Sequence, residues 1–163
     1  MNKGVVTLCL WEPKFPENVG SIIRAAVSFG NVGLIVIFGN RGNSTYNSFI
    51  RHCSDTTKGF DKIPIIKTSK LENLFELIPF NSIPIGIELN ENSINLMNFC
   101  HPKNAFYIFG AEDGGVPTHV LEKCKHIVQI PSELCLNVAA SANIVLYDRV
   151  VKAAKGITYY ERF

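Results

Sequence analysis

The sequence has 163 residues, and its 47% hydrophobic and 18% charged content is enough apolar material for one domain with a substantial core. The 16 Lys and Arg residues nearly balance the 14 Asp and Glu residues, so a nucleic-acid partner would need a local basic patch because the net charge is only +2. The five cysteines are scattered and form no C-x-x-C pair, which argues against a disulfide framework and against a zinc site.

Short apolar runs alternate with helical patterns along the whole chain, which is typical of βα units that form a mostly parallel sheet. In chain order, the sequence predicts a strand over 5–11, a helix over 18–29, strands over 33–39 and 63–66, a helix that begins at Ser69, strands over 83–89 and 105–110, a short helix after Pro117, a strand over 126–130, and a helix from about Asn137 to Ala153. Ser69 and Glu72 match a capping box for the second helix. We therefore expect one α/β domain over residues 1–163, with helices on both faces of the sheet.

The N-terminal apolar run is too short for the hydrophobic region of a signal peptide, and Glu12 and Pro13 interrupt it. No other apolar run is long enough to span a membrane. We expect a soluble, cytoplasmic protein with reduced thiols.

Ligands of an open parallel sheet lie beyond the carboxyl ends of its strands. Three loops at such positions are rich in glycine, proline and small polar residues: PKFPENVG at 13–20, GAEDGGVP at 110–117 and IPSELCLN at 130–137. Arg24, which follows the first loop, is either a solvated surface arginine or a phosphate clamp. The second loop matches neither G-x-G-x-x-G nor a Walker motif, and it is either an ordinary turn or a wall that brings Glu112 to a ligand.

The third loop ends at Asn137, which suits the cap of the last helix. Ser132, Glu133, Ser141 and Asn143 add more polar groups to this segment than a buried helix needs, because an unpaired buried polar group costs about 1–3 kcal/mol. The histidines are expected to be structural or exposed, since their spacing matches neither a catalytic triad nor a metal site; they are His52, His101, His119 and His126. We expect no metal ion, and the neighbouring Cys53 and His52 point apart on any regular element.

The order and spacing of the three loops resemble the SpoU (TrmH) family of RNA ribose 2′-O-methyltransferases, in the SPOUT superfamily. The family motif N-x-G-x-x-x-R is matched by Asn18, Gly20 and Arg24. The motif G-x-E-x-x-G is matched by Gly110 and Glu112 with a further glycine, and the third motif by the stretch IPSELCLNVAASANIVLYD. The resemblance covers essentially the whole chain.

This resemblance implies a fold with a deep trefoil knot near the C-terminus and S-adenosylmethionine (AdoMet) as the cofactor, bound in a bent shape. By the same resemblance, the cofactor pocket is bordered by Glu88, Gly110, Ile130, Pro131, Cys135, Leu136 and Asn137. Members are usually homodimers whose active site lies near the subunit interface. Cys135 and Ala139 stand where the family usually has serine, so a hydroxyl role at these positions is not expected.

The implied reaction transfers a methyl group to a ribose 2′-hydroxyl, which must be oriented and stabilised as it becomes an alkoxide. Arg24 matches the catalytic arginine of the family, and we assign it to holding the RNA phosphate and polarising the hydroxyl. Asn18, Glu112 and Asn137 would position the arginine and the sugar.

Two other functions stay open. A SPOUT-fold module could bind RNA or AdoMet without transfer, and a nucleotide hydrolase would need a nucleophile or metal cluster that the sequence does not show. As substrate we expect tRNA first and rRNA second, since no long extension forms a separate RNA-binding domain. The candidate phosphate contacts are Arg41, Arg51, Lys58 and Lys62.

Overall fold

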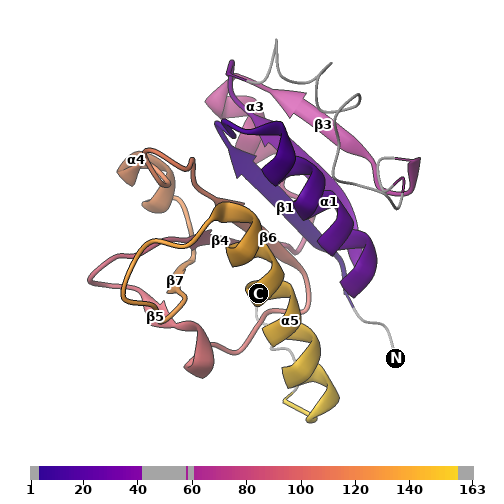
Figure 1. Cartoon of the computed structure of the whole chain (residues 1–163), viewed down its shortest axis with the longest axis vertical. Helices are drawn as coiled ribbons and strands as arrows, with labels where there is room; N and C mark the ends of the chain where they lie inside the picture. Colours follow the sequence, from indigo (N-terminus) through magenta and orange to yellow (C-terminus); the bar gives the residue numbers. More distant parts are fainter. Residues whose placement is uncertain (1–3, 42–57, 59–60, 158–163) are drawn as a thin grey trace.

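The computed structural model describes residues 4–41, 58 and 61–157. Its centre is a seven-stranded sheet in the order β3-β2-β1-β6-β4-β7-β5 (Figure 1). Every pairing between these strands is parallel, which confirms the predicted sheet type. The strands are β1 (Val6–Trp11), β2 (Val32–Phe38), β3 (Ile65–Thr68), β4 (Ile83–Ile87), β5 (Ile94–Asn95), β6 (Ala105–Phe109) and β7 (His126–Gln129).

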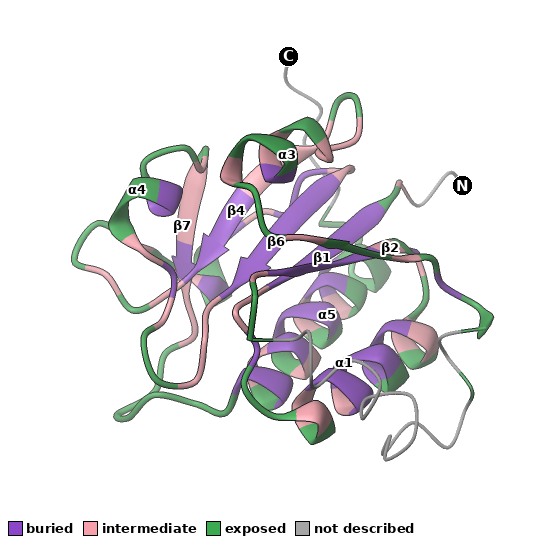
Figure 2. Cartoon of the chain, turned by 90° about the horizontal axis from the view of Figure 1, so that it is seen from above, coloured by how far each residue is buried: buried purple, intermediate pink, exposed green. Residues whose placement is uncertain are grey.

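Helices cover both faces of this sheet, as predicted. The helical segments are α1 (Pro16–Phe29), α3 (Leu71–Glu76), η2 (Leu96–Asn98), α4 (Thr118–Leu121) and α5 (Val138–Ala154). Helices α1 and α5 lie side by side on one face, while α3 and α4 cover the other (Figure 2). Two separate apolar cores result, one on each side of the sheet.

The central strands are buried on both faces because their apolar runs are continuous. Side chains alternate between the two faces along a strand. On β1, Leu8 and Leu10 therefore pack in the core under α1 and α5, whereas Cys9 packs in the core under α3 and α4. On β6, Tyr107 and Ile108 divide in the same way.

Helix α1 begins at Pro16, two residues before the predicted start. Proline suits this first helical turn because its missing N–H would have no partner inside the helix. Asn18 consequently lies within the first turn of α1 and not before it.

The predicted capping box is wrong. Helix α3 begins at Leu71, its N-cap is Lys70, and no side chain caps it. Ser69 therefore lies one residue too early to accept a hydrogen bond from the first turn. Strand β3 also starts at Ile65 and not at residue 63, although Ile63 is buried in the core.

The last helix agrees with its prediction to within one residue at either end. Asn137 is its N-cap, and the side-chain oxygen accepts hydrogen bonds from the N–H groups of Ala139 and Ala140 at 2.8 and 3.2 Å. Gly156, just past the helix, has φ of 74°. In the described parts of the chain, no helix has the length and apolar character needed to cross a bilayer.

Candidate functional site

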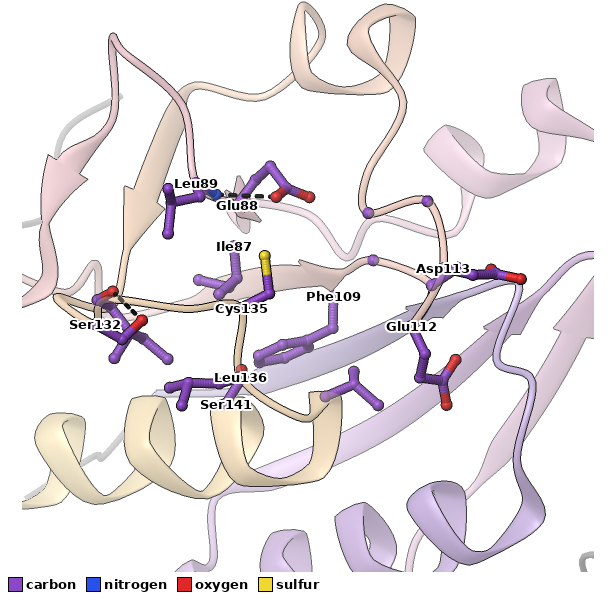
Figure 3. A pocket seen from close by; sticks show the side chains of 16 residues that line it. Ile87, Glu88, Leu89, Phe109, Glu112, Asp113, Ser132, Cys135, Leu136 and Ser141 are labelled. Carbon is purple, nitrogen blue, oxygen red and sulfur yellow. Dashed lines mark hydrogen bonds between the residues drawn. The ribbon is translucent and has the colours of Figure 1, made fainter.

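A cavity of about 430 Å³ lies beyond the carboxyl ends of β4, β6 and β7, beside the first turn of α5 (Figure 3). This is the edge of the sheet at which parallel folds bind ligands. The lining residues come from the last residues of β4 and β6, from three loops and from the start of α5: Ile87, Glu88, Leu89, Phe109, Gly110, Ala111, Glu112, Asp113, Gly114, Gly115, Ile130, Ser132, Cys135, Leu136, Val138 and Ser141.

The glycine loop after β6 presents its backbone to the cavity. Ala111 and Gly115 exchange backbone hydrogen bonds of 3.2 and 2.9 Å, which closes the loop on itself. A Cβ atom on Gly110 would collide with the backbone of Gly115, whereas a Cβ atom on Gly114 would meet nothing within 4 Å. Glycine is therefore required at position 110 for the loop to keep this shape, but not at position 114.

Glu88 holds the far end of the same loop to the end of β4. One carboxylate oxygen accepts a hydrogen bond from the N–H of Val116 at 2.7 Å, and the other accepts from the N–H of Leu89 at 2.9 Å. Both oxygens are thus committed to backbone donors. The structure places Glu88 on the cavity wall, where it shapes the wall through the backbone.

A chain of side-chain hydrogen bonds joins the three loops that the sequence singled out. The Asn137 oxygen is occupied by the N-terminus of α5, so the amide nitrogen must face Asn18, and it donates to the Asn18 oxygen at 2.9 Å. The Asn18 nitrogen then donates to Glu112 at 2.6 Å. The other Glu112 oxygen accepts from the N–H of Lys14 at 3.1 Å. Each amide orientation is therefore fixed by its neighbour.

This chain leads from the positive end of the α5 dipole to the Glu112 carboxylate, an electrostatically favourable order. Glu112 lines the cavity and points from the glycine loop toward α1 (Figure 3). Asn18 and Asn137 stand behind it and do not line the cavity.

The predicted cofactor residues are mostly on the cavity wall. Glu88, Gly110, Ile130, Cys135 and Leu136 line it, whereas Pro131 and Asn137 do not. Sequence reasoning did not assign Leu89, Asp113, Ser132 or Ser141, which also line it. Ser141 had a readable signal, because a residue four positions after a helix cap lies on the same side of the helix as the cap.

The structure does not bring Arg24 into the cavity. Its neighbours Ile22, Ile23 and Ala26 are buried, while Arg24 is exposed on α1. Six residues separate it from Asn18, or about 9 Å along a helix axis. Within the described part of the chain, the Arg24 guanidinium forms no ion pair or side-chain hydrogen bond.

The other candidate phosphate contacts differ in their surroundings. Arg41 donates to Asp113 at 2.7 Å, so its charge is already paired. Lys58 and Lys62 are exposed, and Arg51 lies outside the described residues.

The surroundings of the described cysteines and histidines do not favour a catalytic or metal-binding role. Burial raises the pKa of Cys9 and raises that of Cys124 to about 11, so neither thiol is an activated nucleophile. Among histidines, His101 is buried and His119 is exposed. His126 is partly buried, and His52 and Cys53 lie outside the described residues. The part of the chain that the structure describes contains no cluster of three or more His, Cys, Asp or Glu side chains suited to a metal ion.

The parallel sheet and the cavity beyond the carboxyl ends of its strands are those of a ligand-binding α/β protein. The family model described as the SpoU rRNA Methylase family matches residues 5–147. The chain therefore belongs to the SpoU family of RNA methyltransferases, and the resemblance found in the sequence is confirmed.

Relatives with known structures share the fold at low identity. AviRb from Streptomyces viridochromogenes, a SpoU methyltransferase solved with AdoMet, superposes with a TM-score of 0.78 at 21% identity over 93% of this chain and 58% of its own. An AdoMet-bound rRNA methyltransferase from Sinorhizobium meliloti gives 0.77 at 20% identity, over 90% of this chain and 56% of its own. The chain thus spans little more than half of either protein.

Another relative has a similar length. A Mycoplasma genitalium protein provisionally named tRNA (cytidine(34)-2′-O)-methyltransferase is 24% identical over 91% of both chains. A structure described as giving insight into 2-OH methylation of C/U34 on tRNA superposes with a TM-score of 0.77 at 18% identity, over 94% of this chain and 99% of its own.

Proposed function

We propose that this protein is an AdoMet-dependent RNA methyltransferase that transfers a methyl group to a ribose 2′-hydroxyl. The observation that carries the proposal is the chain Asn137–Asn18–Glu112, which joins the three family motifs at the rim of one cavity. These motifs lie up to 119 residues apart in the sequence. Their convergence beside a cavity is what a transferase for two substrates needs.

The cavity suits AdoMet in size and chemistry. Its volume of about 430 Å³ lies in the range typical of small-molecule sites. Gly110 lets the loop keep the shape of this cavity wall, and Ile130 and Leu136 supply apolar wall. The Glu112 carboxylate offsets the positive charge of a sulfonium. When bound, AdoMet supplies a methyl group already activated for transfer.

The residues of the chain then orient the ribose. Glu112 is a hydrogen-bond acceptor held in place by Asn18, and it can accept the 2′-hydroxyl proton. Asn137 fixes Asn18 from the far side. Arg24 holds the RNA phosphate and polarises the hydroxyl, because a guanidinium keeps its charge and offers a planar fork of donors.

Because Arg24 lies outside its own cavity, we propose that the enzyme is a homodimer in which the site is completed near the subunit interface. Three apolar side chains on α5 support a partner surface: Ile144, Tyr147 and Val150 are 37, 60 and 38% exposed. Mixed dimers of an Arg24→Ala subunit with a Gly110→Ala subunit would regain activity if the two residues serve one site from different subunits. Mixed dimers no more active than either parent would place the whole site in one subunit.

We propose that the substrate is tRNA in preference to rRNA and that the enzyme acts in the cytoplasm. Support comes from the Mycoplasma genitalium relative and from the tRNA-methylating structure, which match nearly their whole length. The rRNA methyltransferases among the relatives make the comparison between the two RNA pools essential.

We also propose that the C-terminal segments form a trefoil knot, as the SPOUT resemblance implies. The small residues at 138–142 and the exposed segment 131–137 suit close threading of one backbone past another. An experimental density map traced from β4 to α5 would test the threading.

The decisive experiment is transfer from labelled AdoMet into unmodified total tRNA and, separately, rRNA. Nuclease digestion should release a labelled 2′-O-methyl nucleoside, and Arg24→Ala should lower turnover by about 100-fold or more. Cofactor affinity gives a matched control in one loop. Gly110→Ala should weaken AdoMet binding at least tenfold, whereas Gly114→Ala should leave it within about twofold. Cofactor binding without transfer to either pool would favour the binding-module function.

A further inference from the structure

Four charged residues at the rim of the cavity form a connected set, here called the rim latch: Glu12, Lys14, Arg41 and Asp113. Glu12 and Lys14 follow β1, Arg41 follows β2, and Asp113 is at the tip of the glycine loop after β6. The latch thus joins the ends of three neighbouring strands. Only Lys14 touches the Asn137–Asn18–Glu112 chain, because its backbone N–H donates to Glu112 at 3.1 Å.

Glu12 is the foundation of the rim latch. It adopts φ of 46°, a left-handed conformation that is uncommon for residues with a side chain. Its carboxylate occupies the space that a Cβ atom on Gly39 would need, and it accepts hydrogen bonds from the N–H groups of Asn40 and Arg41, both at 3.3 Å. A strained residue persists only where its surroundings require it. Here it fixes the backbone that carries Arg41.

Arg41 carries this restraint to the glycine loop. Its Nη1 donates to Asp113 Oδ1 at 2.7 Å, a short charge-assisted bond. Lys14 Nζ lies 3.5 Å from the other Asp113 oxygen. The hydrogen bond from Arg41 is the largest cause that holds the pKa of Asp113 below its usual value. Asp113 is therefore tied on both oxygens.

The loop tip needs such an anchor. Its base is held by Glu88 and by the backbone bonds between Ala111 and Gly115, but these contacts do not reach residue 113. Glu112, next to the tip, must keep facing Asn18 and the N–H of Lys14 to keep its bonds of 2.6 and 3.1 Å. A glycine-rich loop does not supply that accuracy alone.

We propose that Arg41 and Asp113 are positioning residues, which hold the glycine loop so that Glu112 faces the reacting ribose and the loop backbone keeps its place on the cofactor wall. This inference rests on the proposed methyltransferase function. It assigns Arg41 a different role from the RNA phosphate contact expected from the sequence. The charges favour positioning, because two carboxylates balance the two cations of the rim latch and Glu112 adds a further negative charge nearby. Among the described residues of the rim latch and Glu112, a phosphate would meet no net positive charge.

A double-mutant cycle tests the pair. Arg41→Met and Asp113→Ala should each lower the single-turnover rate about tenfold and weaken AdoMet binding about threefold, with the KM for RNA within twofold of wild type. The double variant should be no worse than Asp113→Ala alone, because Asp113→Ala already removes the contact with Arg41. Arg41→Lys should recover part of the rate. Lys155→Met, an exposed cation at the far end of α5, is the control and should change none of these quantities.

A phosphate contact would behave differently. Arg41→Met would then raise the KM for RNA, reduce the slope of log affinity against log salt by about 1, and add to the effect of Asp113→Ala. That result would overturn the inference.

Amide hydrogen exchange separates a failure of this inference from a failure of the proposed function. In the free protein, exchange at Gly115 and Val116 should rise in Arg41→Met and in Asp113→Ala, but not in Lys155→Met. Unchanged exchange would overturn the positioning role whether or not the wild type transfers methyl groups. Raised exchange with no transfer by the wild type would support loop positioning and reject the methyltransferase.

Discussion

Helix α5 is joined to the rest of the molecule by two polar networks, one toward each end, and they differ sharply in burial. Near its N-terminus, Asn137 is exposed, and Asn18 and Glu112 are only partly buried beside the cavity. Toward its C-terminus, His101 and Arg149 are each 2% exposed. The network near the N-terminus of α5 is therefore open to water, whereas the network toward its C-terminus lies in the core.

The buried network clamps α5 to the segment before β6. Arg149 donates to the carbonyl oxygens of Pro102 and Lys103 at 2.7 and 2.6 Å, and also to the Tyr107 hydroxyl at 3.2 Å. Lys152 Nζ donates to the carbonyl of Phe99 at 2.9 Å. Cationic side chains here satisfy backbone carbonyls that a loop without secondary structure leaves inside the core.

His101 completes this network in a defined tautomer. The Asp148 carboxylate can only accept, so His101 Nε2 carries the hydrogen and donates to it at 2.8 Å. In the neutral ring, Nδ1 then accepts from the Tyr107 hydroxyl at 2.6 Å, and the hydroxyl oxygen accepts from Arg149. Asp148 also pairs with Lys152 at 2.6 Å. Burial thus distinguishes the network that stabilises the fold from the network whose groups can exchange partners with a substrate.

The largest expected effect on stability comes from the buried network. Arg149→Met should lower the free energy of unfolding by about 3 kcal/mol, because it leaves buried carbonyls without donors. Denaturant unfolding would measure the loss, with Lys155→Met as the exposed control on the same helix. Methyl transfer per folded molecule should stay within twofold. A loss of activity that exceeds the unfolded fraction would show that the two networks are coupled.

The exposed network should give the reverse result. Asn18→Ala should lower turnover 10- to 100-fold, or about 1.4–2.7 kcal/mol in the barrier, since Glu112 loses the donor that orients it. Stability should fall by less than about 0.5 kcal/mol because water can replace the lost partner. Single-turnover kinetics and denaturant unfolding on one preparation would compare the two. A stability loss as large as that of Arg149→Met would remove the distinction.

Much of the fold was predictable because it depends on local pattern. The runs that became β1, β2 and β6 are apolar apart from Thr7, and Asn137 precedes an alanine-rich segment as an N-cap should. Strand β5 was missed because a two-residue strand carries no periodicity. The capping box at Ser69 failed because the N-cap is Lys70, one residue later, so Ser69 and Glu72 no longer hold the two capping positions.

The networks were much less predictable. Asn18 lies 94 residues from Glu112 and 119 from Asn137, so no local pattern connects them. Only the family resemblance brought these residues together. His101 gave no signal at all, because its partner Asp148 lies 47 residues further on and nothing in the spacing marks the pair.

The pH dependence of stability tests the buried network. Burial lowers the pKa of His101 to about 4, against the opposing effect of the hydrogen bond to Asp148 and with Arg149 and Lys152 nearby. The unfolded chain, with an ordinary histidine near 6.5, therefore binds a proton that the folded chain does not. Stability should fall as the pH drops from about 6.5 to about 4, by up to roughly 1.4 kcal/mol per pH unit.

His101→Gln should flatten this slope, whatever it does to absolute stability. His126 also has a lowered pKa caused by partial burial, so His126→Gln is the parallel variant and should remove a smaller part of the slope. Urea unfolding at a series of pH values would measure all three proteins. An unchanged slope in His101→Gln would mean that the buried network does not titrate through this residue.

The smallest expected effect comes from a substitution that alters only the exposed network. Asn137→Asp keeps an oxygen to accept from Ala139 and Ala140, and its negative charge suits the N-terminus of α5. It removes the N–H that Asn137 donates to Asn18. Stability should stay within about 0.5 kcal/mol of wild type, while turnover falls several-fold because Asn18 loses its orienting partner.

Asn137→Ala is the matched comparison, because it removes the cap and the donor together and should cost about 1 kcal/mol of stability. If capping were the only role of Asn137, the aspartate variant would be as active as wild type and only the alanine variant would be impaired. Equal loss of turnover in both variants would assign the activity to the donated hydrogen bond. The cap and the link to Asn18 are separate functions of one side chain, and this pair of substitutions measures each of them.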